Sequence, residues 1–367
     1  MKVNNIPSTT RMSGFYIVYK TPCLVDKPQE RGIFHLIEHM ICRQIQPYYG
    51  LFEQFAIDFN AITTHDYVVF YIAGIDDYIN KYKDDFYELV TKHYQFDEKE
   101  LFEEKTVILQ EYANFFSNPS SAIKANGLRK YYNYYGPIGQ RNSIENIDLE
   151  SLQSIYKQRF SCPFMIINVS QKPEFQKEIR PCVVSPKDKI EYLTFLEYND
   201  AEFEPVSSNS ILISAMKDFI PNEDLSKSQM LNYLLCGSIN APIVNRLRTE
   251  LCLCYSVFLT DCVIGNRHTV FIETETEEKN KKVVVNNISH IIDNLDLFIT
   301  RDLYNLAVDH FRVKREMQMI ARHNNITDLF YPNLMQVDAL ESLTYESVLE
   351  HGKIYYSDYI QKFIAYE

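Results

Sequence analysis

The sequence contains no tryptophan and only 10 glycines in 367 residues, although 27 tyrosines and 23 phenylalanines make it rich in aromatic side chains. Basic residues are also scarce, because 37 Lys and Arg stand against 49 Asp and Glu and give a formal net charge of -12. A nucleic-acid backbone is bound by a basic stripe that releases counterions, so nucleic acid is excluded as a partner. The acidic charge can steer basic peptides toward the protein, but it is also what an ordinary soluble surface carries.

The cysteines lack the paired CxxC spacing of thiolate zinc sites, and they suggest no disulfide framework. We therefore expect free thiols and a reducing cytoplasm. Long hydrophobic runs are absent too: no segment reaches the roughly twenty apolar residues that span a bilayer, and the first twenty residues lack the apolar region of a signal peptide. These absences predict a soluble cytoplasmic protein with no membrane span.

The length predicts two domains, because it exceeds what one hydrophobic core usually serves. Period-two and helical apolar patterns alternate in the order strand, helix, helix, strand, strand, helix, and this order occurs twice. The first copy has strands in "GFYIVYK", "AITTH" and "DYVVFYIAG" and helices in "GIFHLIEHMICR", "LFEQFAIDF" and 77–93. The second has strands in "NSILISAM", "CYSVFLTD" and "HTVFIETE" and helices in 224–236, 241–250 and 277–295.

These patterns predict an α+β fold that is a tandem duplication, with each sheet covered by helices. We expect an N-terminal domain at 1–180, a linker rich in proline and charge at 181–206, and a C-terminal domain at 207–367. In the first domain, a helix over 97–117 begins with a capping box formed by Asp97 and Glu100. Asp148 begins a further helix.

The string "GIFHLIEHMICR" places His35, Glu38 and His39 within an arc of roughly 100 degrees on one helical face. Two imidazoles one turn apart can ligate a single zinc ion, and the glutamate beside them is then available as a general base. The alternative is a chance alignment of two structural histidines and a surface glutamate.

A catalytic zinc needs a third protein ligand and one position left open for water. Glu104 and Glu111 are seven residues apart on the helix over 97–117, so they share a face and offer this third carboxylate. A solvated acidic face is the alternative interpretation. It suits Glu98, Glu100 and Glu103 but is less suited to Glu111, which lies in the apolar context "VILQEY".

The chain resembles the insulinase (pitrilysin) family of zinc peptidases, the inverzincins. "GIFHLIEHM" is similar to the HxxEH block of that family, "FNAITTHDYVVFY" to its Asn-Ala-x-Thr strand, and "EEKTVILQEYANFFSNP" to its third-ligand helix. "IGQRNSIENIDLESLQSIYKQRF" is similar to the segment that follows. In the second half, "IVNRLRTELCLCYSV" resembles the paired Arg and Tyr element and "LLCGSINAP" the glycine-containing loop before it.

The resemblance implies a zinc endopeptidase with His35, His39 and Glu111 as metal ligands and Glu38 as the general base. Glu104 would orient a ligand from beside the metal. Asn60 and Ala61 would lie on an edge strand that pairs with extended substrate. Arg248 and Tyr255 would bind the substrate backbone or stabilise the oxyanion from the other domain.

Family members of this length resemble half of a clamshell-type peptidase, so the resemblance also implies a dimer that encloses a chamber for unstructured peptides, presequences or leader peptides. A homodimer and a heterodimer with a related subunit both stay open. So does a non-catalytic subunit that binds peptides or acts as a scaffold, although its complete zinc motif argues against this. A purely structural metal site would need a fourth ligand, for which His65 is the nearby candidate.

Overall fold

The computed structural model describes residues 2–21, 27–175, 204, 211–219, 225–264, 267–320 and 343–357. These residues form two compact units. The first contains the described residues within 1–114, 134–192 and 318–329, and the second contains those within 115–133, 193–317 and 330–367. The predicted linker at 181–206 lies outside the described residues except for Glu204, so the predicted domain boundaries stay a prediction.

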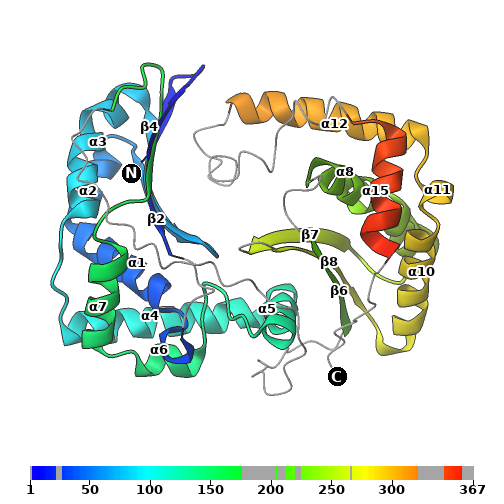
Figure 1. The fold of residues 1–367 in the computed structure, drawn as a ribbon, viewed down its shortest axis with the longest axis horizontal. Coiled ribbons are helices and arrows are strands. Elements are labelled where there is room, and N and C mark those ends of the chain that lie inside the picture. Colours follow the sequence, from blue (N-terminus) through cyan, green and yellow to red (C-terminus); the bar gives the residue numbers. More distant parts are fainter. Residues whose placement is uncertain are drawn as a thin grey trace. The chain divides into compact units, whose positions relative to one another are not determined.

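The first unit is built on a five-stranded sheet in the order β1-β5-β2-β4-β3, in which β1 and β5 are parallel and the other neighbours are antiparallel. Helices gather on one face of this sheet (Figure 1). The strands are β1 (Lys2–Pro7), β2 (Met12–Lys20), β3 (Asp58–Thr63), β4 (Tyr67–Ile75) and β5 (Met165–Ser170). The helices are α1 (Ile33–Ile45), α2 (Tyr49–Gln54), α3 (Asp76–Thr91), α4 (Glu98–Ser117), α6 (Arg141–Asn146) and α7 (Leu149–Arg159).

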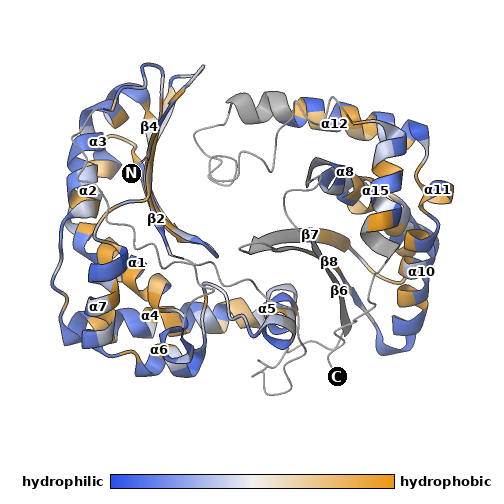
Figure 2. Ribbon diagram, viewed as in Figure 1, coloured by the Kyte–Doolittle hydropathy of each residue, from blue (hydrophilic) through white to orange (hydrophobic). Residues whose placement is uncertain are grey.

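The core of the first unit lies between α1 and the central strands. Residues of β2, the central strand of the sheet, are buried from Ser13 to Tyr19 without alternation. On α1, Leu36, Ile37 and Met40 are fully buried, whereas the two histidines stay partly exposed. Figure 2 shows hydrophobic residues concentrated on α1 and β4 and hydrophilic residues on the outer side of α3. This apolar face fixes α1 against the sheet and leaves the histidines free for another role.

The second unit repeats the topology of the first. Its sheet order β6-β8-β7 is antiparallel throughout and matches β2-β4-β3, with two helical segments after the first strand and one after the last. The elements are α5 (Pro119–Tyr132), β6 (Ile211–Phe219), α8 (Leu225–Cys236), α9 (Pro242–Val244), β7 (Val257–Ile264), β8 (Arg267–Thr276), α10 (Lys281–Asp293), α11 (Leu295–Phe298), α12 (Arg301–Ile320) and α15 (Tyr345–Ser357). The predicted α+β fold with repeated, helix-covered sheets is therefore confirmed.

The helix predicted over 241–250 is present, but its second part is a π-helix rather than an α-helix. After α9 the chain forms a π-helical turn at Asn245–Glu250, in which the Leu251 N–H donates to the Arg246 carbonyl five residues back. "LFEQFAIDF" is also only partly helical, because α2 ends at Gln54, Ala56 takes a positive φ of 49°, and the remainder joins β3. In both cases the backbone conformation changes within a segment whose apolar spacing does not indicate the change.

The predicted helix starts are confirmed. The Glu100 N–H donates to Asp97 Oδ1 at 2.8 Å and the Asp97 N–H to Glu100 Oε2 at 3.2 Å, which completes the capping box of α4. Asp148 likewise accepts from the Ser151 N–H at the start of α7. Among the cysteines, Cys162 is disulfide-bonded, so the expectation of free thiols is wrong there. It holds for Cys42, Cys236, Cys252 and Cys254, which are free.

No helix in the part of the chain that the structure describes is long and apolar enough to cross a membrane.

Asp76, the first residue of α3, joins this helix to β2 and to the end of β5 through hydrogen bonds. Its Oδ1 accepts from the Ser13 hydroxyl, from the Ser170 hydroxyl at 2.7 Å and from the Gln171 N–H at 3.0 Å, while its Oδ2 accepts from the Asn80 amide at 3.0 Å. Burial raises the pKa of Asp76, but these bonds outweigh burial and lower it below the ordinary 3.8. The carboxylate is therefore stabilised in its charged form.

Substituting Asp76→Asn should lower the free energy of unfolding of this unit by about 2 kcal/mol at about pH 7, because a buried charged acceptor is lost. Since the folded pKa lies below the unfolded one, this contribution is complete above the unfolded pKa and is lost as pH falls through the folded pKa. Urea unfolding followed by circular dichroism suits a chain without tryptophan. A stability difference that stayed the same down to about pH 3 would contradict this assignment.

Candidate metal centre

Helices α1 and α4 bring His35, His39 and Glu111 together. Glu111 Oε2 lies 3.4 Å from His35 Nε2 and 3.7 Å from His39 Nε2, and one ligand atom from each residue fits within 4.8 Å of the others. Two ligands about 2.1 Å from a tetrahedral zinc ion lie roughly 3.4 Å apart. The two histidine side chains are 15% and 16% exposed and Glu111 is 45% exposed, so the group opens to solvent on the carboxylate side.

Glu104 and Arg43 hold His39 from behind. Glu104 Oε2 lies 3.2 Å from His39 Nδ1, and Arg43 donates to Glu104 Oε1 at 2.9 Å. With Nδ1 engaged in this way, Nε2 of His39 is left facing Glu111. Carboxylates commonly orient metal-ligating histidines through this bond. The predicted position of Glu104 beside the ligands thus corresponds to a direct contact with one of them.

The acidic face of α4 is partly engaged rather than merely solvated. Arg43 also pairs with Glu103, and Gln44 donates to Glu100 Oε1 at 2.8 Å. Sequence reasoning treated these two glutamates as a solvated face and did not consider Arg43. The partners lie about sixty positions apart in the chain, so no local spacing signals the ion pair.

Glu38 is held next to the histidines by β3. It is 7% exposed, and the Thr63 hydroxyl donates to its Oε2 at 2.5 Å. Among the described residues, no hydrogen bond engages its other oxygen, Oε1. The carboxylate borders a pocket that His39 also lines. Thr63 was missed by the sequence analysis, although "NAITT" contains it.

The local charges favour ionised carboxylates around the histidines. Burial lowers the pKa of His39, but its hydrogen bond to the Glu104 carboxylate and the charges of Glu38 and Glu111 outweigh burial and raise the pKa above 6.5. The His35 hydrogen bond lowers the pKa of Glu111. Burial raises the pKa of Glu104, yet its bonds to His39 and Arg43 lower it overall. The negative charge of these carboxylates, which favours a proton on His39, would equally favour a bound cation.

The start of α1 is fixed by two glycines in left-handed conformations. Gly32, the residue before the helix, has a φ of 95°, and Gly139 has a φ of 73°. A Cβ on Gly139 would lie 2.5 Å from the Gly32 Cα and 2.7 Å from the Arg31 carbonyl oxygen. Arg31 also stacks on the Tyr135 ring at 3.8 Å. Backbone therefore meets backbone three residues before His35.

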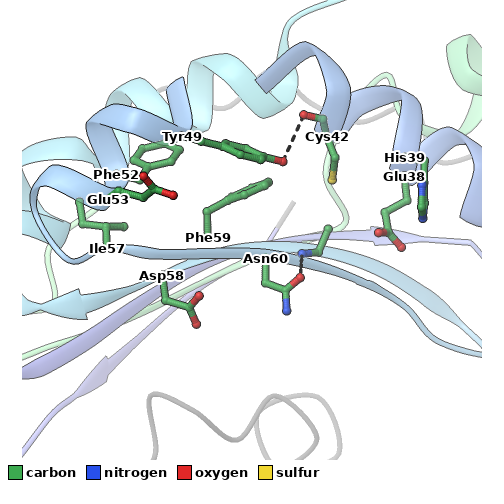
Figure 3. Close-up of a pocket in the computed structure, with 11 residues that line it drawn as sticks. Glu38, His39, Cys42, Tyr49, Phe52, Glu53, Ile57, Asp58, Phe59 and Asn60 are labelled. Carbon is green, nitrogen blue, oxygen red and sulfur yellow. Dashed lines mark hydrogen bonds between the residues drawn. The ribbon is translucent and has the colours of Figure 1, made fainter. Parts of the chain in front are cut away.

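A pocket of about 340 Å³ runs from Glu38 and His39 along β3 (Figure 3). Asn60 and Ala61 line it, and they lie on β3, the outermost strand of the described sheet. The Ala61 N–H donates to Asn60 Oδ1 at 2.8 Å. Both residues are thus on an edge strand, as the sequence suggested, while their contact with substrate stays a prediction.

Arg248 and Tyr255 belong to the second unit and contact each other, with the guanidinium 5.0 Å from the ring centroid. Tyr255 is 83% exposed. Their approach to the metal-ligand group stays a prediction. His65 bonds to the Tyr134 hydroxyl at 2.6 Å, and burial lowers its pKa to about 4. It is not part of the His35, His39 and Glu111 group, so the described residues offer no fourth ligand there.

Residues 6–135 match the insulinase family, Peptidase family M16. The matched stretch is similar to that family, and it includes every residue of the metal-ligand group and the first copy of the repeated fold. An uncharacterized zinc protease of Rickettsia bellii is 20% identical over 268 residues, which cover 66% of this chain and 62% of that protein. The match thus spans less than two thirds of the relative's length.

Solved structures share the fold over nearly the whole chain. A protease from Helicobacter pylori gives a TM-score of 0.77 at 14% identity, covering 100% of this chain and 97% of that one. A peptidase M16 inactive domain from Pseudomonas fluorescens gives 0.69 at 13% identity, covering 99% and 94%. The fold is therefore that of M16 peptidases, and one similar structure is described as inactive.

Proposed function

We propose that the protein is a zinc-dependent endopeptidase of the HxxEH type that hydrolyses unstructured peptides. The observation that carries the proposal is the approach of two imidazoles and one carboxylate within 4.8 Å, with a second carboxylate bonded to the far nitrogen of His39. This donor set suits zinc, and three protein ligands leave one position open, as catalytic rather than structural zinc sites do. His35, His39 and Glu111 would hold the ion.

Bound there, zinc would polarise the scissile carbonyl and acidify a water molecule. The protein's own part is to move the proton and to hold the substrate. Glu38 accepts a proton from the attacking water and delivers it to the leaving amine, while Thr63 fixes one carboxylate oxygen and leaves the other for this transfer. The outer edge of β3 presents backbone groups that pair with an extended peptide. Arg248 and Tyr255 would contact substrate from the second unit.

A chain of this size would act as one half of a dimer, either with itself or with a related subunit, in the cytoplasm. A non-catalytic, peptide-binding subunit is the second candidate, and the inactive M16 domain with the same fold favours considering it. The intact set of His35, Glu38, His39 and Glu111 supports catalysis instead.

Removing the metal tests the proposal directly. Protein loaded with zinc should bind about one ion per chain and cleave a quenched peptide library, and a chelator should abolish cleavage until zinc is restored. Metal content is measured by atomic emission and cleavage by fluorescence, with and without a candidate partner subunit. Tight zinc binding with no cleavage in either setting would favour the non-catalytic subunit.

Glu104→Gln should weaken zinc binding by about 10- to 100-fold while leaving the fold intact, because it removes the charged acceptor that orients His39. Competition with a fluorescent chelator measures the affinity. Glu103→Gln is the matched control, since Glu103 contacts Arg43 but no ligand. Equal losses in both variants would show that Glu104 has no special role.

A further inference from the structure

The polar contact between α1 and α4 extends one helical turn beyond the metal-ligand group. Three residues of α1, spaced four apart, share one helical face, and each contacts a carboxylate of α4. The pairs are His35 with Glu111, His39 with Glu104 and Glu111, and Arg43 with Glu103 and Glu104. Partner numbers fall along α4 as residue numbers rise along α1, so the two helices run antiparallel. The two histidines and Arg43 therefore form one continuous row.

Arg43 ends this row and binds two carboxylates at once. One terminal nitrogen donates to Glu104 Oε1 at 2.9 Å, and the other contacts Glu103 Oε2. Its Nε also lies 4.0 Å from Glu100 Oε1. A guanidinium presents its donors in a rigid planar fork, so these bonds fix the carboxylates in direction as well as in distance. Among the described residues, no lysine and no other arginine forms an ion pair with Glu104.

Glu104 depends on this cation for its place beside His39. Its Oε1 accepts from Arg43 and its Oε2 lies 3.2 Å from His39 Nδ1, so the carboxylate is held at both oxygens. Glu100, Glu103 and Glu104 lie within about one helical turn, and like charges at this spacing repel one another. Without Arg43 this repulsion would be unopposed at Glu104, and the side chain would turn toward solvent and away from the imidazole.

We infer that Arg43 is a positioning residue of the metal centre, which holds the Glu104 carboxylate against Nδ1 of His39. The imidazole is then fixed with Nε2 facing Glu111, on the side where the ion would bind. The ion pairs of Arg43 among the described residues all go to glutamates outside the metal-ligand group, so it acts on the histidine through Glu104. This inference rests on the proposed zinc site and adds to it a residue that touches neither metal nor substrate.

A double-mutant cycle separates this role from a purely structural link between the two helices. The zinc affinity of the full-length protein is measured by competition with a fluorescent chelator in Arg43→Met, in Glu104→Gln and in the double variant. Arg43→Met should weaken zinc binding about tenfold, at the lower end of the range for groups that support a ligand. In the Glu104→Gln background the same substitution should change the affinity by less than about twofold, because the carboxylate through which Arg43 acts is already gone.

Two further variants test whether the positive charge beside Glu104 is the cause. Arg43→Lys keeps a cation within reach of Glu104 and should recover most of the lost affinity. Lys99→Met is the matched control, because Lys99 is exposed and lies 3.8 Å from Glu103 Oε1 but forms no ion pair with Glu104 among the described residues. It should bind zinc as the wild type does.

The inference would be overturned if Arg43→Met bound zinc like the wild type, or if it lost as much affinity in the Glu104→Gln background as in the wild-type one. A loss in Arg43→Lys or in Lys99→Met as large as that in Arg43→Met would overturn it too.

The zinc-free protein gives a readout that does not depend on the proposed function. In nitrogen NMR with isotope-labelled histidine, the Nδ1 resonance of His39 reports its hydrogen bond to Glu104 directly, and its absence from His39→Ala assigns it. It should move in Arg43→Met as it does in Glu104→Gln, and stay in place in Lys99→Met. An unmoved resonance in Arg43→Met would contradict the inference whatever the zinc affinity. Wild-type protein that binds no zinc, or binds it without cleaving peptides, would contradict the proposed function alone, and the resonance would then decide the inference.

Discussion

Replacing Glu38 by glutamine should lower kcat by about 100- to 10,000-fold while zinc binding stays unchanged. The amide can still accept the Thr63 hydroxyl bond that the carboxylate receives at 2.5 Å, so the side chain keeps its place. It has no basic oxygen that can take a proton from water at neutral pH. Zinc per chain and cleavage of a quenched peptide are measured on the same preparation.

Glu98→Gln is the matched control for this substitution, because Glu98 lies in the first turn of α4 and away from the metal-ligand group. It should leave both zinc content and turnover as in the wild type. Turnover in Glu38→Gln equal to that of the wild type would remove Glu38 as the general base. Loss of zinc together with turnover would instead assign Glu38 to metal binding.

Replacing His39 by alanine should abolish cleavage and lower zinc affinity by more than about 100-fold, because a ligand is removed where loss of its supporting carboxylate alone costs 10- to 100-fold. It also leaves Glu104 without its histidine partner. After dialysis against a weak chelator, the wild type should retain zinc and the variant should not. Metal analysis reads this outcome without any activity assay.

His93→Ala provides the control, since His93 is an exposed histidine in the same unit. It should keep zinc and activity. Full zinc retention in His39→Ala would mean that the ion is bound elsewhere, and the proposed ligand set would then be wrong. A circular dichroism spectrum like that of the wild type separates loss of metal from loss of fold.

The sequence predicted those parts of the site that depend on the spacing of residues within one helix. The placement of His35 and His39 follows from helical period, and the capped start of α4 set the phase of Glu111. Arg43 and Thr63 escaped prediction because their roles depend on contacts between elements. Which charged side chain meets which is decided by how α1, α4 and β3 pack, and a single sequence contains no sign of that packing.

The fold, too, was predicted where the signal is local. Apolar periodicity predicted the order of strands and helices in both copies, and the structure has this order around the strands β2-β4-β3 and β6-β8-β7. The strand β1 was missed because "KVNNIP" has little apolar alternation and owes its conformation to parallel pairing with β5. No prediction was made for α12 and α15.

The contact between Gly32 and Gly139 has a consequence for how this protein can vary. The chain has few glycines, and two of them are in contact at the start of α1. A side chain at either position would displace this helix, which contains both histidines. Displacements of about half an ångström are enough to spoil a ligand set. Mutations at Gly32 and Gly139 are therefore expected to impair the metal-ligand group, although neither residue belongs to that group.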